Sequence, residues 1–441
     1  MIKDSIRKLP YLAGFTLVAI LFIVTAKNGF FWDTIQLGSE HAVFFLSTGF
    51  SQLLLPDSID SGHIPAFGFY LALMWKIFGR SLIVSHIAML PFIAGILWQL
   101  IRLLNKLVKP RYAGWAFLIV LADPSLLSQM TLMSPDVPLV FFFLLGLNAI
   151  LENRRIMLSI ALAFLFLTSM RGMMVASCLF FVDIWQNIYR GCKPESRISG
   201  IFNRLLIFMP ALSIFTLYNG YHFYIKGWIG FHHASPWASL FERVPLSGMI
   251  YNAGIIGWRL VDFGRIGLWI LFFYLLLRLK KDIFTQSNAR FLFFTFFIVT
   301  LFLSINMIWA RNLLCHRYLL PAYISFSLFC VTMLFSLETG NRLKIIWISF
   351  LLVTLISGNL WVYPEKIATG WDATLAHLPY YRVRKEAIKY LDKNNVDFMQ
   401  VQSFFPNISS IDDFDLDGDR RQFHDFNNST LYVLYSNVFN I

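Results

Sequence analysis

An aspartate at the end of the first apolar segment is the first residue that could do chemistry. Asp33 follows three aromatic residues, Phe30 to Trp32. A carboxylate at a membrane surface is costly to desolvate and is functional by default. It could act as a general base that deprotonates a hydroxyl or an amine. Glu40 and His41 follow one to two helical turns later. The alternative for this acidic cluster is a solvated helix cap beside an interfacial tryptophan.

Two further polar clusters are predicted on the same side as Asp33. Asp60 and His63 precede Pro65, and Asp136 follows another proline. Asp60 could be a helix cap and His63 a turn residue, although neither role excludes chemistry. Proline and aspartate in the first turn of a helix are also ordinary helix-start signals. A second acid near Asp33 could hold a substrate or a divalent metal ion, so Asp33 and Asp136 are the candidate metal ligands.

Basic residues at the outer ends of apolar segments form a third group. Arg171 interrupts an apolar run, and Arg311, His316 and Arg317 precede another. Long basic side chains can simply snorkel to the interface. A guanidinium group, however, matches phosphate oxygens with bidentate geometry. Because these charges break the positive-inside pattern, we predict that they bind a phosphate.

The composition is that of an integral membrane protein. Of the 441 residues, 57% are hydrophobic and 14% are charged, whereas a soluble domain carries about 25% charged residues. The net charge of +12 does not indicate a nucleic-acid partner, because the basic residues lie mostly in short turns between apolar runs. The four cysteines have no C-x-x-C spacing, which argues against a disulfide framework or a zinc site.

The pattern predicts an all-α polytopic protein with about eleven transmembrane helices. If the apolar stretch 64–79 lies along the outer surface instead of crossing, nearly every basic turn falls on the cytoplasmic side. We therefore expect an interfacial helix in the first external loop, 29–81, a cytoplasmic N-terminus and a bacterial inner membrane. A second interfacial helix is expected in the loop 225–262. The predicted spans are 11–28, 82–104, 113–131, 136–151, 156–170, 172–189, 204–224, 263–279, 290–309, 317–336 and 344–362.

The end of the chain differs from the rest. Residues 363–441 are polar and mixed in charge, with a helical pattern near 380–394 and a strand-like pattern near 431–435. We predict a transmembrane domain, 1–362, and a small extracytoplasmic α/β domain, 363–441.

Several of these motifs together resemble the GT-C superfamily of glycosyltransferases, and within it glycosyltransferase family 39. The resemblance covers about 30–340, and its specificity comes from the order and sidedness of the motifs. Thr34 after Asp33, and Ile64 and Ala66 after His63, depart from the pattern of the protein-mannosylating members. The matching elements are Trp32-Asp33, His63–Tyr70, Pro135-Asp136, Thr168–Gly172 and Arg317–Pro321.

The resemblance implies a polyprenyl-phosphate-linked sugar donor and a lipid, glycan or protein acceptor outside the cytoplasm. Asp33 would be the general base for displacement with inversion. Asp136 would position the acceptor or a metal ion, and His63 would belong to the same catalytic group. Arg171 and Arg317, with Arg311 and His316, would stabilise the leaving phosphate. Glu40, His41 and Asp60 are expected on the acceptor side. Trp371 and Asp372 match no motif of the family, and we expect them at the rim of the acceptor site because they lie just outside the last predicted span.

Two other functions stay open. A flippase or transporter of lipid-linked saccharides would place polar residues through the middle of the membrane, yet 290–309 and 344–362 are almost wholly apolar. An oligosaccharide ligase or polymerase would share the donor type.

Overall fold

The computed structural model describes most of the chain. The described residues are 2–189, 197–230, 232–233, 238, 242–280, 284–311, 315–361, 363, 372–405, 407–426 and 432–434. Trp371 and part of the predicted strand near 431–435 lie outside them.

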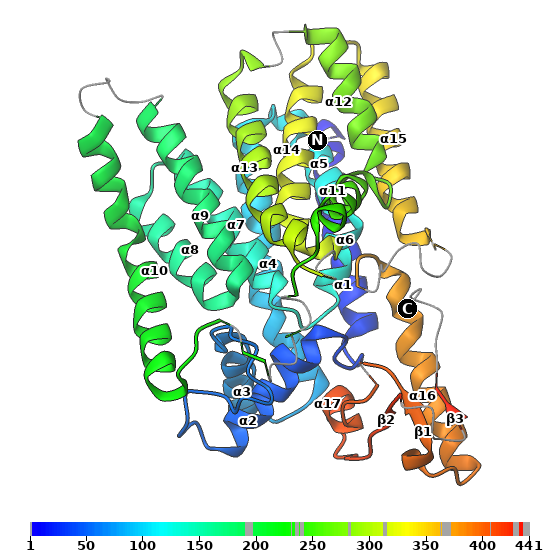
Figure 1. Cartoon of the computed structure of the whole chain (residues 1–441). Coiled ribbons are helices and arrows are strands. Elements are labelled where there is room, and N and C mark those ends of the chain that lie inside the picture. Colours follow the sequence, from blue (N-terminus) through cyan, green and yellow to red (C-terminus); the bar gives the residue numbers. More distant parts are fainter. Residues whose placement is uncertain are drawn as a thin grey trace.

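Helices account for nearly all of the regular structure up to residue 360 (Figure 1). The first half contains α1 (Ile2–Thr25), π-helix η1 (Ile35–Glu40), α2 (His41–Ser47), α3 (Ala66–Phe78), α4 (Leu82–Leu107), α5 (Pro110–Leu121), α6 (Pro124–Met130), α7 (Asp136–Leu151), α8 (Arg155–Thr168), α9 (Met170–Ile184) and π-helix η2 (Trp185–Tyr189). The second half contains α10 (Arg197–Lys226), α11 (Leu246–Val261), α12 (Ile266–Leu279), α13 (Ser287–Trp309), 3₁₀-helix η6 (His316–Leu319), α14 (Leu320–Ser336), α15 (Asn341–Ser357) and 3₁₀-helix η7 (Gly358–Leu360).

Six helices in the described part of the chain are long and apolar enough to cross a membrane, or up to eight spans if two bent pairs each count as one. A helix lies at each of the eleven predicted ranges, but α7, α8 and α9 have only 16, 14 and 15 residues, fewer than the roughly 17–25 residues of a membrane span. The count of eleven crossings therefore stays a prediction. The helix expected in 225–262 is confirmed as α11, which is bent by 85° against α12.

Helix α14 is the innermost helix of the bundle. Every residue from Leu320 to Phe335 is buried, as expected for a helix that is apolar on all sides. It packs against α13, α5 and α12. Because α14 begins directly after Arg317, the bundle carries this charged residue into its interior.

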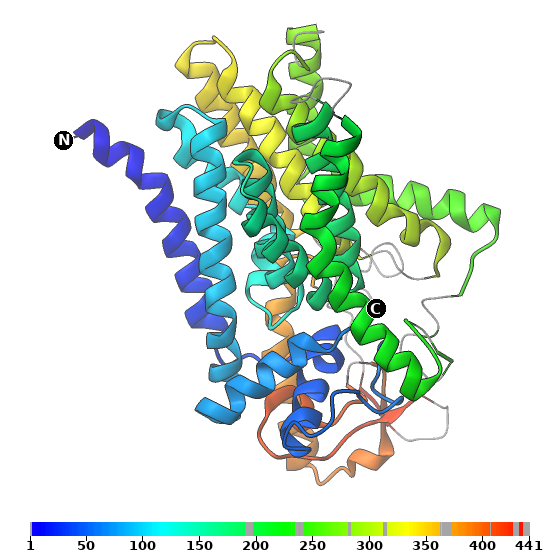
Figure 2. The same cartoon turned by 90° about the vertical axis from the view of Figure 1, so that its left-hand side faces the viewer.

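The first loop and the C-terminal elements lie at the same end of the bundle (Figure 1). Figure 2 shows α1 running from the opposite end down to the first loop. The predicted interfacial segment forms α3, which packs against α2 and α4.

The C-terminal part packs both on itself and on the bundle. Its own small core contains Leu391, Phe398, Val401, Ile411 and Phe423, and strand β1 pairs in parallel with β2 and β3. Tyr380, Tyr381 and Phe414 instead join the main core. The division at residue 362 therefore stays a prediction. The elements are 3₁₀-helix η8 (Leu375–His377), α16 (Leu378–Lys393), 3₁₀-helix η9 (Phe398–Gln400), β1 (Val401–Ser403), α17 (Ile411–Asp415), β2 (His424–Asp425) and β3 (Tyr432–Val433).

Candidate active site

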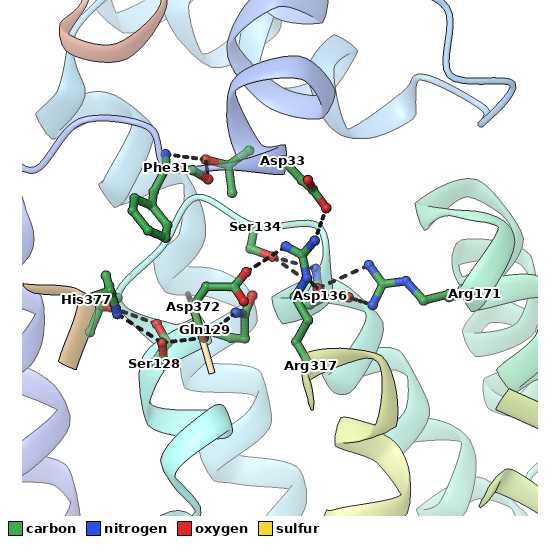
Figure 3. Close-up of polar contacts among 12 residues, drawn as sticks. Phe31, Asp33, Ser128, Gln129, Ser134, Asp136, Arg171, Arg317, Asp372 and His377 are labelled. Carbon is green, nitrogen blue, oxygen red and sulfur yellow. Dashed lines mark hydrogen bonds and ion pairs between the residues drawn. The ribbon is translucent and has the colours of Figure 1, made fainter. Parts of the chain in front are cut away.

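A buried arginine that faces three carboxylates forms the centre of the site (Figure 3). Arg317 lies in η6 and is 2% exposed. Its guanidinium donates to Asp33 and, over 2.7 Å, to Asp372. Its Nε lies 3.8 Å from Oδ2 of Asp136. A charge this deeply buried requires such paired and hydrogen-bonded partners.

A second arginine shares one of these carboxylates. Nη1 and Nη2 of Arg171 lie 2.6 and 3.2 Å from the two oxygens of Asp136, which is a bidentate pair. The guanidinium carbon also lies 4.3 Å from the ring centroid of Tyr318, within the range of a cation–π contact. In this cluster three carboxylates face two guanidinium groups, so both arginine charges are already paired.

The backbone turns sharply to present Asp33. Trp32 has φ of 53°, in the left-handed region that a bulky residue rarely adopts. The turn is closed by Thr34, whose Oγ1 accepts the N–H of Phe31 over 2.7 Å. Phe31 is buried, with the Tyr380 ring 5.3 Å away. Strain of this kind persists only where packing over-determines it, and it concentrates at functional sites.

Helix starts position Asp136 and Arg171. Asp136 is the first residue of α7, where the helix dipole favours a carboxylate. Arg171 is the second residue of α9, and the predicted break before it is confirmed by the extended backbone of Ser169. The Ser169 hydroxyl accepts the N–H of Gly172 over 3.1 Å. A Cβ at Gly172 would lie 2.0 Å from the carbonyl oxygen of Leu165, so α8 and α9 can approach this closely only at a glycine.

Asp372 reaches the cluster from beyond the last helix of the bundle. Its backbone carbonyl accepts hydrogen bonds from Ser128 Oγ over 2.6 Å and from Gln129 Nε2 over 3.1 Å. Both donors belong to α6, and Nδ1 of His377 lies 3.2 Å from the same Ser128 hydroxyl. Asp372 was predicted at the rim of the acceptor site, and the structure places its buried side chain against Arg317.

A cavity of about 270 Å³ borders the cluster. Its polar lining residues include Asp33, His63 and Arg171. Its apolar lining residues come mainly from α9 and α13 and include Met174, Leu303 and Met307. An apolar cavity with a few convergent polar groups is the usual form of a small-molecule site.

His63 presents one ring nitrogen as a donor. Its Nδ1 accepts the backbone N–H of Met170 over 3.1 Å, at the start of α9. Burial, the largest cause, and the charge of Arg171 lower the pKa of His63 to about 3. The ring is therefore neutral at physiological pH and carries its proton on Nε2, because Nδ1 is an acceptor.

The structure does not bring the other predicted residues into the cluster. Nε2 of His41 lies 2.9 Å from the Ile59 carbonyl oxygen, and Glu40 accepts from Ser409 over 3.4 Å. Asp60 lies 3.0 Å from His222 and 2.5 Å from Lys226 on α10. Arg311 is exposed and pairs with Glu242 over 2.9 Å, and His316 lies 2.8 Å from Asp262.

The donor set does not suit a metal ion. Asp33 and Asp136, the candidate ligands, are both engaged by arginines. Within the described ranges, no group of three or more His, Cys, Asp and Glu side chains is arranged to hold one. The residues present fit a guanidinium–carboxylate cluster, and no step below uses a metal.

Sequence reasoning missed two features near the site. Arg243 lines the cavity from the loop 225–262, in which the sequence predicts no site residue. Arg265, between α11 and α12, forms a fully buried ion pair with Asp123 over 2.7 Å. Both charges of this pair interrupt apolar runs in the sequence, and that signal could have identified them as partners.

Comparison with known proteins gives one match. No family model matches the sequence, and no curated protein matches it. Among solved structures, the crystal structure of ArnT from Cupriavidus metallidurans bound to undecaprenyl phosphate is similar, with a TM-score of 0.51 and 12% identity. The fold is GT-C. The match covers 77% of this chain, which spans 62% of the length of that protein.

This likeness in fold agrees with the fold that the sequence resemblance implies. Together with the long apolar helices, it identifies the chain as a multi-pass membrane protein.

Proposed function

We propose that this protein is a membrane glycosyltransferase that moves a sugar from a polyprenyl-phosphate donor to an acceptor outside the cytoplasm. The observation that carries the proposal is the mixed lining of the cavity, which combines the charged side chains of Asp33 and Arg171 with apolar side chains that include Met174, Leu303 and Met307. Such a cavity suits a ligand with a charged head and a hydrocarbon tail. The ArnT structure, bound to undecaprenyl phosphate, supports a donor of this kind.

In the proposed reaction, an acceptor hydroxyl or amine attacks the anomeric carbon of the sugar. The new bond forms on the face opposite the bond to the phosphate oxygen, which breaks with inversion. Asp33 takes the acceptor proton as general base, and the electron pair of the broken bond leaves on the polyprenyl phosphate. Arg171 and Arg317 stabilise the negative charge that develops on this leaving group.

The ion pair between Arg317 and Asp33 implies that the donor binds before Asp33 acts as the general base. A carboxylate bonded to a guanidinium is a weak base, because the positive charge favours its ionised form. When a phosphate group accepts hydrogen bonds from Arg317, Asp33 loses part of that partner and becomes more basic. Donor binding therefore makes Asp33 a stronger base. The neutral His63 can in addition donate a hydrogen bond from Nε2 to a sugar or phosphate oxygen.

The proposed site faces the outside of a bacterial inner membrane, with the N-terminus of the chain in the cytoplasm. The first loop, Asp372 and the C-terminal elements would all lie on the outer side. The first loop and the C-terminal elements share one end of the bundle (Figure 1), which supports this arrangement, as does the distribution of basic turns.

A donor panel in proteoliposomes tests the proposal. Purified protein would be given several polyprenyl-phosphate sugars with candidate acceptors. We expect release of polyprenyl phosphate with at least one donor, and a product of inverted anomeric configuration. Translocation of labelled lipid without release from any donor would overturn the proposal in favour of a flippase.

A further inference from the structure

One basic residue at the cavity differs from the others in its surroundings. Arg243 lines the cavity and is exposed. Its guanidinium carbon lies 5.7 Å from the ring centroid of Trp309, and among the described residues it has no carboxylate partner. Arg171, the other arginine lining this cavity, is paired bidentately with Asp136.

Backbone hydrogen bonds fix the position of Arg243. Arg243 and Ala310 form an antiparallel bridge, with hydrogen bonds from Val244 N–H to the Trp309 carbonyl and from Arg311 N–H to the Glu242 carbonyl, over 3.1 and 3.0 Å. Below the bridge, the buried side chain of Asn252 donates to the carbonyl oxygens of Met307, Ile308 and Ala310 over 3.1–3.2 Å. This segment ties the end of α13 to α11 and fixes the rim of the cavity.

The charges around the cavity indicate a role for Arg243 in attracting a phosphate anion, which Arg171 and Arg317 cannot fill alone. Both guanidinium groups of the buried cluster are already paired with carboxylates, so the cluster does not attract an incoming phosphate anion over a distance. An unpaired guanidinium at the rim provides that attraction, and its donors match phosphate oxygens. The aromatic ring beneath it leaves the outer N–H groups free to donate.

We propose that Arg243 captures the anionic head group of the lipid at the rim of the cavity, before the phosphate exchanges onto Arg171 and Arg317. This inference rests on the proposed function, because it assumes a phosphate-bearing lipid ligand. Arg243 is then a binding residue, so its loss weakens ligand affinity and leaves the chemical step largely intact.

Binding of a short-chain polyprenyl monophosphate to detergent-solubilised protein tests this inference. Tryptophan fluorescence is a suitable readout, because Trp309 lies beside Arg243. We expect Arg243→Gln to weaken binding about tenfold, since a hydrogen bond to a charged group contributes about that much. The difference in binding affinity between wild type and Arg243→Gln should decrease at high salt, because an exposed charge is screened. In transfer assays KM should rise with little change in kcat.

Two controls keep the outcomes distinct. Arg382→Gln removes an arginine that is 80% exposed on α16 and should bind like wild type. The uncharged polyprenol should bind equally to wild type and Arg243→Gln. Equal affinity of wild type and Arg243→Gln for the monophosphate would overturn this inference and leave the proposed function standing. If wild-type protein binds neither the monophosphate nor any donor, the proposed function fails, and the inference fails with it.

Discussion

At the scale of single residues, the sequence identified the charged residues of the cluster but not the contacts between them. Asp33, Asp136, Arg171 and Arg317 were singled out as charges that an apolar chain would otherwise avoid, and the structure brings all four together. That Arg317 would join three carboxylates could not be predicted, because such pairing depends on helix packing across the whole chain. Asp372 is predicted on the acceptor side from its position just outside the last span, and nothing in the local sequence shows that its segment returns to Arg317.

Substitution of Arg317 tests the role of the several N–H donors on its planar guanidinium group. Lysine keeps the charge but has neither the planar geometry nor the reach to bond Asp33 and Asp372 together. We expect Arg317→Lys to lower the transfer rate by about 10²-fold or more. Arg317→Ala leaves buried carboxylates unpaired and should destabilise the fold by about 3–5 kcal/mol. Transfer rates and thermal unfolding measure the two effects, with Arg382→Lys as control. Wild-type rates in Arg317→Lys would contradict the proposed role.

At the scale of elements, the sequence predicts the helices, and the exact residues at which α7 and α9 begin position Asp136 and Arg171 in the cluster. Apolar runs of about 20 residues located the long helices, and the motif Thr168–Gly172 located the break between α8 and α9. Periodicity could not reveal the π-helix that follows Asp33, nor the 3₁₀-turn that carries Arg317. Both depend on packing of neighbouring elements, not on local propensity.

Crowding the contact between α8 and α9 should disturb the site from a distance. In Gly172→Ala, the new methyl group meets the Leu165 carbonyl and pushes the start of α9, with Arg171, away from Asp136. We expect a loss of about 1–3 kcal/mol in unfolding free energy and slower transfer. Gly254→Ala is the control, because a Cβ there meets nothing within 4 Å. Unchanged stability and activity in Gly172→Ala would show that this contact does not position Arg171.

At the scale of the whole molecule, the C-terminal segment is part of the site. Asp372 completes the cluster, Phe30 N–H donates to the Phe414 carbonyl over 2.9 Å, and Arg80 pairs with Asp412 over 2.8 Å. Polar composition alone predicted a separate unit. Composition could not show that aromatic residues within it pack on the bundle.

The contact between the first loop and α17 should make stability depend on pH. Burial, the largest cause, and the nearby Asp413 raise the pKa of Glu40 from 4.5 to about 7. The folded state therefore favours protonated Glu40, so stability falls as pH rises from 4.5 to 7 and recovers as pH falls. Glu40→Gln should unfold at a higher temperature than wild type at pH 8 and match it near pH 4. Glu386→Gln, on the exposed face of α16, is the control. A pH profile unchanged by Glu40→Gln would contradict burial of this carboxyl.

Cysteine labelling tests the orientation of the chain. In a Cys192→Ser background, Asp417→Cys should react with an impermeant maleimide in intact cells, whereas Lys280→Cys should react only after permeabilisation. Both positions are exposed, and Cys178, Cys315 and Cys330 are buried. The reverse labelling pattern would show that the site faces the cytoplasm.

The central claim is that Asp33, held by Arg317, is the base of a transferase. The most direct measurement is the rate of polyprenyl-phosphate release from a donor that wild type accepts, compared with Asp33→Asn. Asp57→Asn is the matched control, because Asp57 is an exposed aspartate of the same loop. Release that falls by about 10²-fold or more in folded Asp33→Asn, and persists in Asp57→Asn, is the predicted result. Equal release by wild type and Asp33→Asn would contradict the account.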